Sequence, residues 1–205
     1  MHGSRPEVGL LELQRLLIQE RAAGREALAV YDIFDPKTQE QVGVARERSG
    51  SLRKFLRRFL GKRLLTTKLE VRETEDESLV FTVHRTFGWW RPRIDVYDAD
   101  DHLMGYGQNR ASCGHGGYRI YDRRNLLFAE MKGALQGGNG CFLAPDGRQL
   151  GTVTRQWIEP RAEARVPASH YLVSISDELA EQPLAKMLLL GAALAIHMVH
   201  PGKGK

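Results

Sequence analysis

The chain has 205 residues, with 42% hydrophobic residues, 27% charged residues and a formal net charge of +5. This composition is ordinary for a soluble globular protein, and the length suffices for one domain with a sizeable core. Its two cysteines, Cys113 and Cys141, do not form a CxxC pair, so neither a structural zinc site nor a redox motif is indicated. Residues 1–9 are polar and lack the apolar core of a signal peptide, which predicts a cytoplasmic protein.

The first predicted element is a short amphipathic helix over residues 10–21. Leu10, Leu13 and Leu17 fall on one side of it at helical spacing. We therefore expect residues 1–27 to form a helical arm. The arm either caps the main domain or binds a partner.

From Leu28 onward apolar and polar residues alternate, and the same unit occurs five times. Each unit predicts a β-hairpin, because Asp, Asn, Pro or Gly stands at the turn between its two halves. A further strand, Tyr171–Ile175, follows the last unit. The five units are Leu28–Ala45, Leu69–His84, Arg93–Tyr106, Tyr118–Met131 and Gly140–Thr154.

The most apolar stretch, Pro183–Val199, predicts a helix near the end of the chain. No charged residue stands between Met187 and Ile196, so every face of this helix is apolar. A helix that spans a membrane needs about 20 apolar residues, and shorter runs are more often buried in a protein core. Gly191 and the alanines around it make one side slim, as a helix inside a narrow enclosure requires.

Ten or eleven short antiparallel strands in series predict a mainly β fold, a closed barrel of about 10–12 strands. A barrel of this size has an apolar interior, and the terminal helix would fill it. The predicted domain spans residues 28–200 and is followed by a short basic tail, 201–205.

This arrangement resembles the tubby-like fold, and within it the phospholipid scramblase and LURP-one-related family. The residues that carry the resemblance are Met104–Tyr106, Tyr118–Lys132, Gly151–Trp157 and the helix Leu184–Val199. The resemblance implies a β-barrel around one central hydrophobic helix and a function at phospholipid membranes.

Two features of animal scramblases are missing. Their acidic, calcium-loop-like run corresponds here to Arg165–Glu178, which lacks closely spaced oxygen ligands. The cysteine cluster that carries palmitate is also absent. The resemblance therefore implies a minimal, bacterial-type member, for which calcium-triggered scrambling is not expected.

The segment Arg46–Arg63 is the most basic part of the chain, with eight Lys or Arg residues and one acid, a net charge of +7. Leu52, Phe55 and Phe59 recur within it at helical spacing, among basic residues. A basic helix with Phe and Leu on its apolar side is typical of an interfacial membrane helix. Two alternatives remain: the apolar side packs on the barrel, or the basic residues bind nucleic acid phosphates.

A second candidate is Phe87–Arg93, where Trp89 and Trp90 stand beside arginines between two hairpins. Adjacent indoles suit the lipid headgroup layer, although they also suit the closure of a barrel end. The residues predicted to contact lipid are Arg53, Lys54, Phe55, Arg57, Arg58, Phe59, Lys62, Arg63, Trp89, Trp90, Arg91 and Arg93.

No pattern of catalytic or metal-binding residues stands out. Cys113 and His115 lie in a Gly-rich connection without an orienting third group, and the histidines lack metal-ligand spacing. We expect no catalytic residue, metal or cofactor.

The sequence therefore predicts a non-enzymatic protein that binds anionic phospholipid, with phosphoinositide as one candidate, peripherally at the inner face of the membrane. The first alternative is a soluble scaffold or regulatory module that binds an acidic protein or nucleic acid. The second is phospholipid scrambling between leaflets.

Overall fold

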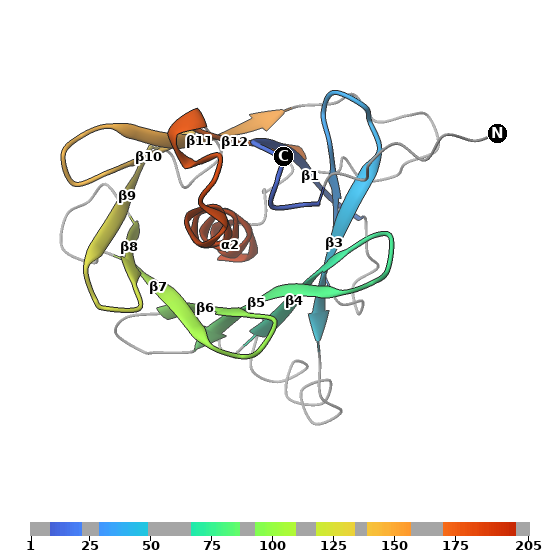
Figure 1. The fold of residues 1–205 in the computed structure, drawn as a ribbon, viewed down its shortest axis with the longest axis horizontal. Coiled ribbons are helices and arrows are strands. Elements are labelled where there is room, and N and C mark those ends of the chain that lie inside the picture. Colours follow the sequence, from blue (N-terminus) through green and yellow to red (C-terminus); the bar gives the residue numbers. More distant parts are fainter. Residues whose placement is uncertain are drawn as a thin grey trace.

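The computed structural model describes residues 9–21, 29–48, 67–86, 93–109, 118–133, 139–156 and 170–199. Within these residues the chain forms twelve antiparallel strands that close into a barrel around one helix, α2 (Pro183–Val199) (Figure 1). The predicted fold class is confirmed, and the helix has the predicted bounds.

Every strand pairs with its neighbour in sequence, and the first strand pairs with the last to close the barrel. The five predicted hairpins and the strand before the helix are confirmed. The strands are β1 (Arg15–Glu20), β2 (Val30–Phe34), β3 (Gln41–Arg48), β4 (Thr67–Glu73), β5 (Leu79–Thr86), β6 (Arg93–Asp98), β7 (Leu103–Asn109), β8 (Tyr118–Asp122), β9 (Leu127–Gly133), β10 (Gly140–Leu143), β11 (Gln149–Gln156) and β12 (His170–Ile175).

Three of the five hairpins, β6–β7, β8–β9 and β10–β11, share one kind of turn, and the turns of β2–β3 and β4–β5 are one residue longer. In the β6–β7 hairpin, the Asp98 N–H donates to the His102 carbonyl and the Asp101 N–H donates to the Asp98 carbonyl. Asp122 makes the same pair of bonds in the β8–β9 hairpin. Each turn has one residue with positive φ near its end, and each hairpin has one register shift beside the turn, as a bulged hairpin requires. The five positive-φ residues are Gln39, Glu77, Asp101, Asn125 and Gly147.

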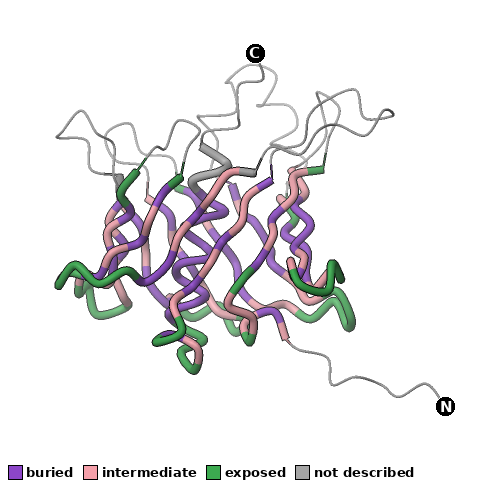
Figure 2. Tube along the Cα trace, turned by 90° about the horizontal axis from the view of Figure 1, so that it is seen from above, coloured by how far each residue is buried: buried purple, intermediate pink, exposed green. Residues whose placement is uncertain are grey.

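The core consists of the inward side chains of the strands and the apolar surface of α2. Leu189 and Leu190 are completely buried. Buried residues also occur along the strands that form the wall of the barrel (Figure 2). At Gly191 an added Cβ would lie 2.9 Å from Val96 Cγ2 of β6, so a slim helix is needed here, as predicted. Among the described residues, no helix has the length and hydropathy required to cross a membrane.

The predicted N-terminal helix is wrong for the residues that the structure describes. Residues 15–20 form β1, in which Leu16 and Ile18 point inward and are 1% exposed. Leu10, Leu13 and Leu17 satisfy a helical spacing, but β1 pairs with both β12 and β2 and so closes the barrel. Non-local pairing of this kind overrides a short helical pattern.

Residues 9–14, which precede β1, lie across one end of the barrel and are tied to α2. Leu10 is completely buried, and its N–H donates to Glu73 Oε1 at 3.0 Å. Lys186 of α2 is 1% exposed, and its Nζ donates to the carbonyl oxygens of Leu11 (2.8 Å) and Glu12 (3.2 Å). Burial lowers the pKa of Lys186, while Glu181 and Glu12 act in the opposite direction. The residue that ends the apolar run in the sequence is therefore inside the barrel, where it holds the N-terminal segment.

Candidate functional site

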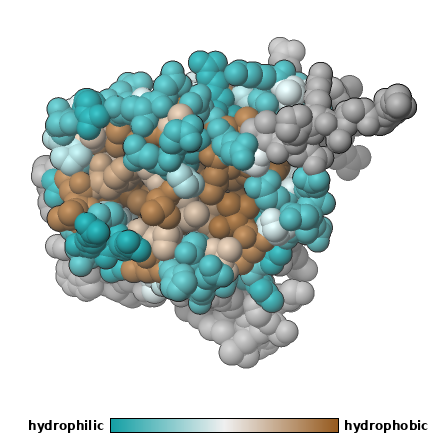
Figure 3. All heavy atoms as spheres, viewed as in Figure 1, coloured by the Kyte–Doolittle hydropathy of each residue, from teal (hydrophilic) through white to brown (hydrophobic). Residues whose placement is uncertain are grey.

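The antiparallel order gives the barrel two different ends. Short turns join the strands at one end, which we call the turn end. Figure 3 looks onto it and shows apolar surface in a hollow framed by polar turn tips. At the opposite end, which we call the connection end, the joined strand ends are separated by longer stretches of sequence. The turn-end segments are 9–14, 35–40, 74–78, 99–102, 123–126, 144–148 and 176–182; the connections at the other end are 21–29, 49–66, 87–92, 110–117, 134–139, 157–169 and, after α2, 200–205.

Charge separates sharply between these two sets of segments. The turn-end segments carry twelve acidic and four basic residues, a net charge of −8. The connections at the other end carry three acidic and fourteen basic residues, a net charge of +11. The strands, α2 and residues 1–8 supply the remaining +2 of the total +5. The positive field is therefore broader than the one basic segment that the sequence singled out, and it opposes an acidic end.

The two predicted lipid-binding segments join four consecutive strands at the connection end. Arg48, the last residue of β3, stands opposite Lys68 of β4, and Thr86, the last residue of β5, stands opposite Arg93. Residues 49–66 and 87–92 lie outside the described residues, so of the predicted site residues only Arg93 is described. Their points of attachment are nevertheless neighbours on one rim.

The basic insertion begins later than predicted. Arg46, Glu47 and Arg48 belong to β3, so a helix over Arg46–Arg63 is wrong for its first three residues. The segment between β3 and β4, residues 49–66, carries six basic residues and no acidic residue.

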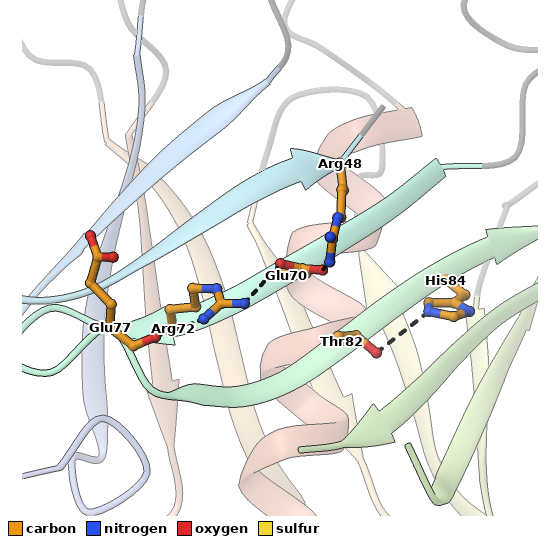
Figure 4. A network of polar contacts seen from close by, with 6 residues as sticks. All are labelled: Arg48, Glu70, Arg72, Glu77, Thr82 and His84. Carbon is orange, nitrogen blue, oxygen red and sulfur yellow. Dashed lines mark hydrogen bonds and ion pairs between the residues drawn. The ribbon is translucent and has the colours of Figure 1, made fainter. Parts of the chain in front are cut away.

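On the outer wall, Arg48 is part of an ion-pair network (Figure 4). Its Nη1 lies 2.6 Å from Glu70 Oε1, and Arg72 Nη2 lies 3.1 Å from Glu70 Oε2. Partial burial by itself would raise the pKa of Glu70, but the hydrogen bonds from the two arginines lower it. Farther along the wall, the Thr82 hydroxyl lies 3.5 Å from His84 Nε2 (Figure 4). The charge of Arg48 is thus balanced within the wall.

Arg93 lies along the outer wall in a similar way. Its Nε donates to Asp95 Oδ1, and its guanidinium carbon lies 3.8 Å from the centre of the Tyr106 ring. Tyr106 in turn stacks on Tyr121, with ring centroids 5.0 Å apart. A cation–π contact and an ion pair fix the side chain, so Arg93 contributes little free charge to the rim.

A groove of about 480 Å³ opens at the turn end, between the β8–β9 and β10–β11 turns and the 3-10 helix η2 (Asp177–Leu179). Its apolar lining includes Leu127, Phe128, Leu150 and Leu179. At its rim, Arg148 Nε lies 2.7 Å from Asp146 Oδ2, and Arg148 Nη1 lies 2.7 Å from Glu178 Oε2. Sequence reasoning missed this groove because its walls come from three separate segments, each of which is an ordinary turn by itself.

The described residues contain one group with the composition of a metal site: Asp98, Asp100 and His102. Asp98 Oδ1 accepts the backbone N–H groups of His102 (2.8 Å) and Asp100 (3.0 Å), and these bonds lower the pKa of Asp98. Asp122 accepts equivalent bonds from its own turn. The geometry is therefore that of a recurring turn.

No family model, curated protein or solved structure matches the chain. The resemblance to scramblase-like barrels stays a prediction.

Proposed function

We propose that the protein is a non-enzymatic barrel that binds anionic phospholipid surfaces through its connection end. The lipid-contacting residues belong to the basic segment between β3 and β4 and to the tryptophan-containing segment between β5 and β6. The relation to scramblase-like proteins is part of this proposal.

The separation of charge along the barrel is the observation that carries the proposal. A molecule with +11 on the connections at one end and −8 on those at the other turns its basic end toward an anionic surface. Each basic residue close to such a surface contributes about 1 kcal/mol to binding. The six basic residues of segment 49–66 therefore provide strong attraction, and Phe55 and Phe59 add apolar groups for the headgroup layer.

The burial of α2 supports peripheral binding. Leu188, Leu190 and Leu194 are at most 4% exposed inside the barrel, so the most apolar part of the chain is already covered by protein. Peripheral binding does not require α2 to leave the barrel. Scrambling by a route that inserts α2 into lipid would first have to open the barrel.

Co-sedimentation with vesicles tests the proposal. We expect the full chain to pellet with vesicles that contain phosphatidylserine, and far less with pure phosphatidylcholine. The Phe55→Ser/Phe59→Ser variant should lose most of this binding.

Leu126→Ser/Leu184→Ser is the matched control, because these two leucines are 61% and 49% exposed and lie away from the connection end. It should bind like the wild type. Equal pelleting of the wild type and the phenylalanine variant would overturn the interfacial-segment proposal.

Binding to an acidic protein or a nucleic acid uses the same charge but does not need the phenylalanines. This alternative would be favoured if the Phe55→Ser/Phe59→Ser variant kept full affinity for DNA or for an acidic polypeptide and the wild type did not bind anionic vesicles. A dithionite-quench assay on reconstituted vesicles tests scrambling.

A further inference from the structure

We propose that the groove at the turn end docks the basic segment 49–66 of a second copy of this chain, so that the protein self-associates head to tail. This inference concerns the protein without lipid and does not depend on membrane binding.

The groove has the form of a docking site. Its volume of about 480 Å³ lies within the range of about 300–1,000 Å³ found for ligand pockets. Leu127, Phe128 and Leu150 give it an apolar lining, and Leu126 beside it is 61% exposed. An exposed leucine next to an apolar groove marks a surface that gains free energy when another apolar group covers it.

Charge complementarity points to the occupant. The segments 144–148 and 176–182, which border the groove, carry four acids and one base. The single base, Arg148, is shared between Asp146 and Glu178. Arg123 and Arg124 lie in the third bordering turn, so the acidic side is the one formed by 176–182. A basic segment with apolar residues therefore matches the apolar lining, the acidic side formed by 176–182 and the net charge of −8 on the turn-end segments.

Segment 49–66 of the same chain has this chemistry. It carries six basic residues and no acid, and Phe55 and Phe59 are four residues apart, the anchor spacing of a helix that binds in a groove. The strand ends that it joins lie at the opposite end of the barrel from the groove, which favours docking into the groove of a second copy. Docking into a second copy uses one patch on each molecule and leaves one free, which gives open-ended association.

Sedimentation velocity of the full chain without lipid tests the proposal. At low salt the average mass should rise continuously with protein concentration, and at about 1 M salt it should return to the monomer, because the Debye length is then about 3 Å. A monomer at every concentration at low salt would overturn the proposal and leave the lipid function untouched.

Two variants locate the contact. Glu178→Arg should weaken association at least tenfold, because it reverses an acid at the groove rim. Glu75→Arg in the 74–78 turn makes the same charge change away from the groove and should associate like the wild type. An equal loss in both variants would show that only the overall charge matters, which contradicts docking in the groove.

A mixing experiment makes the test independent of folding defects. Glu178→Arg keeps the segment and loses the groove, whereas Phe55→Ser/Phe59→Ser keeps the groove and loses the segment. Each alone should remain monomeric, and a mixture should form a one-to-one complex. Failure to form this complex, with both variants melting at the wild-type temperature, would refute head-to-tail docking.

Discussion

The two ends of the barrel differ in the structure and in the charge of their connections. The turn end is built from short bulged hairpins, each with one residue of positive φ, and the N-terminal segment anchored by Leu10 covers part of it. The connection end is where the longer stretches leave the strands, and these stretches carry fourteen basic residues against three acidic ones. A meander barrel thus sorts its connections by end, and charge placed on alternate connections becomes a separation of charge along the axis.

Strand β4 shows the contrast within one element. Glu70, in the middle of the strand, has its pKa lowered by hydrogen bonds from Arg48 and Arg72 against the effect of burial. Glu73, at the turn end of the same strand, has its pKa raised by burial and by the nearby Asp76 and Glu12. Between Glu70 and Glu73, three residues apart on β4, the environment changes from one that favours the charged carboxylate to one that disfavours it.

The largest expected effect concerns the N-terminal segment. Leu10→Ala should lower the free energy of unfolding by about 2–5 kcal/mol, because Leu10 is completely buried. Leu126→Ala at an exposed turn position should change it by less than about 0.5 kcal/mol. Urea denaturation measures both. A loss below about 0.5 kcal/mol for Leu10→Ala would mean that residues 9–14 do not close the turn end.

A smaller effect should follow the loss of the carboxylate in the middle of β4. Glu70→Gln should cost about 1 kcal/mol at neutral pH, because both arginines lose a charged partner. The pKa of Glu70 is lowered in the folded state, so its contribution is present above pH 4.5 and is lost as the pH falls through the folded pKa. Unfolding curves of the variant and the wild type should converge in acid; a constant difference would exclude this electrostatic origin.

The smallest expected effect is an increase in the free energy of unfolding. Glu73→Gln should stabilise the protein by less than about 1 kcal/mol at neutral pH, since an amide oxygen still accepts the Leu10 N–H without the charge. The pKa of Glu73 is raised in the folded state, so the contribution of Glu73 to stability is fully present below pH 4.5 and is lost as the pH rises through the folded pKa. Melting temperatures of the variant and the wild type at pH 4 and pH 7 check this, and a gain of the same size at both pH values would contradict it.

Most of the fold could be predicted from the sequence because it depends on local signals. The alternation of apolar and polar residues and the turn residues predict the hairpins, and the absence of charged residues over ten positions predicts α2. Strand β1 could not be predicted, because Leu16, Leu17 and Ile18 fit either a helix or a strand, and only its pairing with β12 and β2 decides.

The candidate site was predictable in its charge but not in its surroundings. The basic segment is visible in the sequence, whereas the opposing acids are scattered over turns far apart in the chain, and the barrel order gathers them at one end. Likewise, Lys186 looked like the boundary of an apolar run, because its two carbonyl partners lie about 175 residues earlier.

The central claim, that the two ends bind differently, is tested most directly by paired charge reversal in the vesicle assay. Arg57→Glu/Arg58→Glu changes the connection between β3 and β4, and Arg123→Glu/Arg124→Glu makes the same change in the turn between β8 and β9. At low protein concentration, the first variant should bind phosphatidylserine vesicles at least about tenfold more weakly than the wild type, and the second less than about twofold more weakly. Equal losses in the two variants would contradict the account, because binding would then follow the net charge of the protein and not the end that carries it.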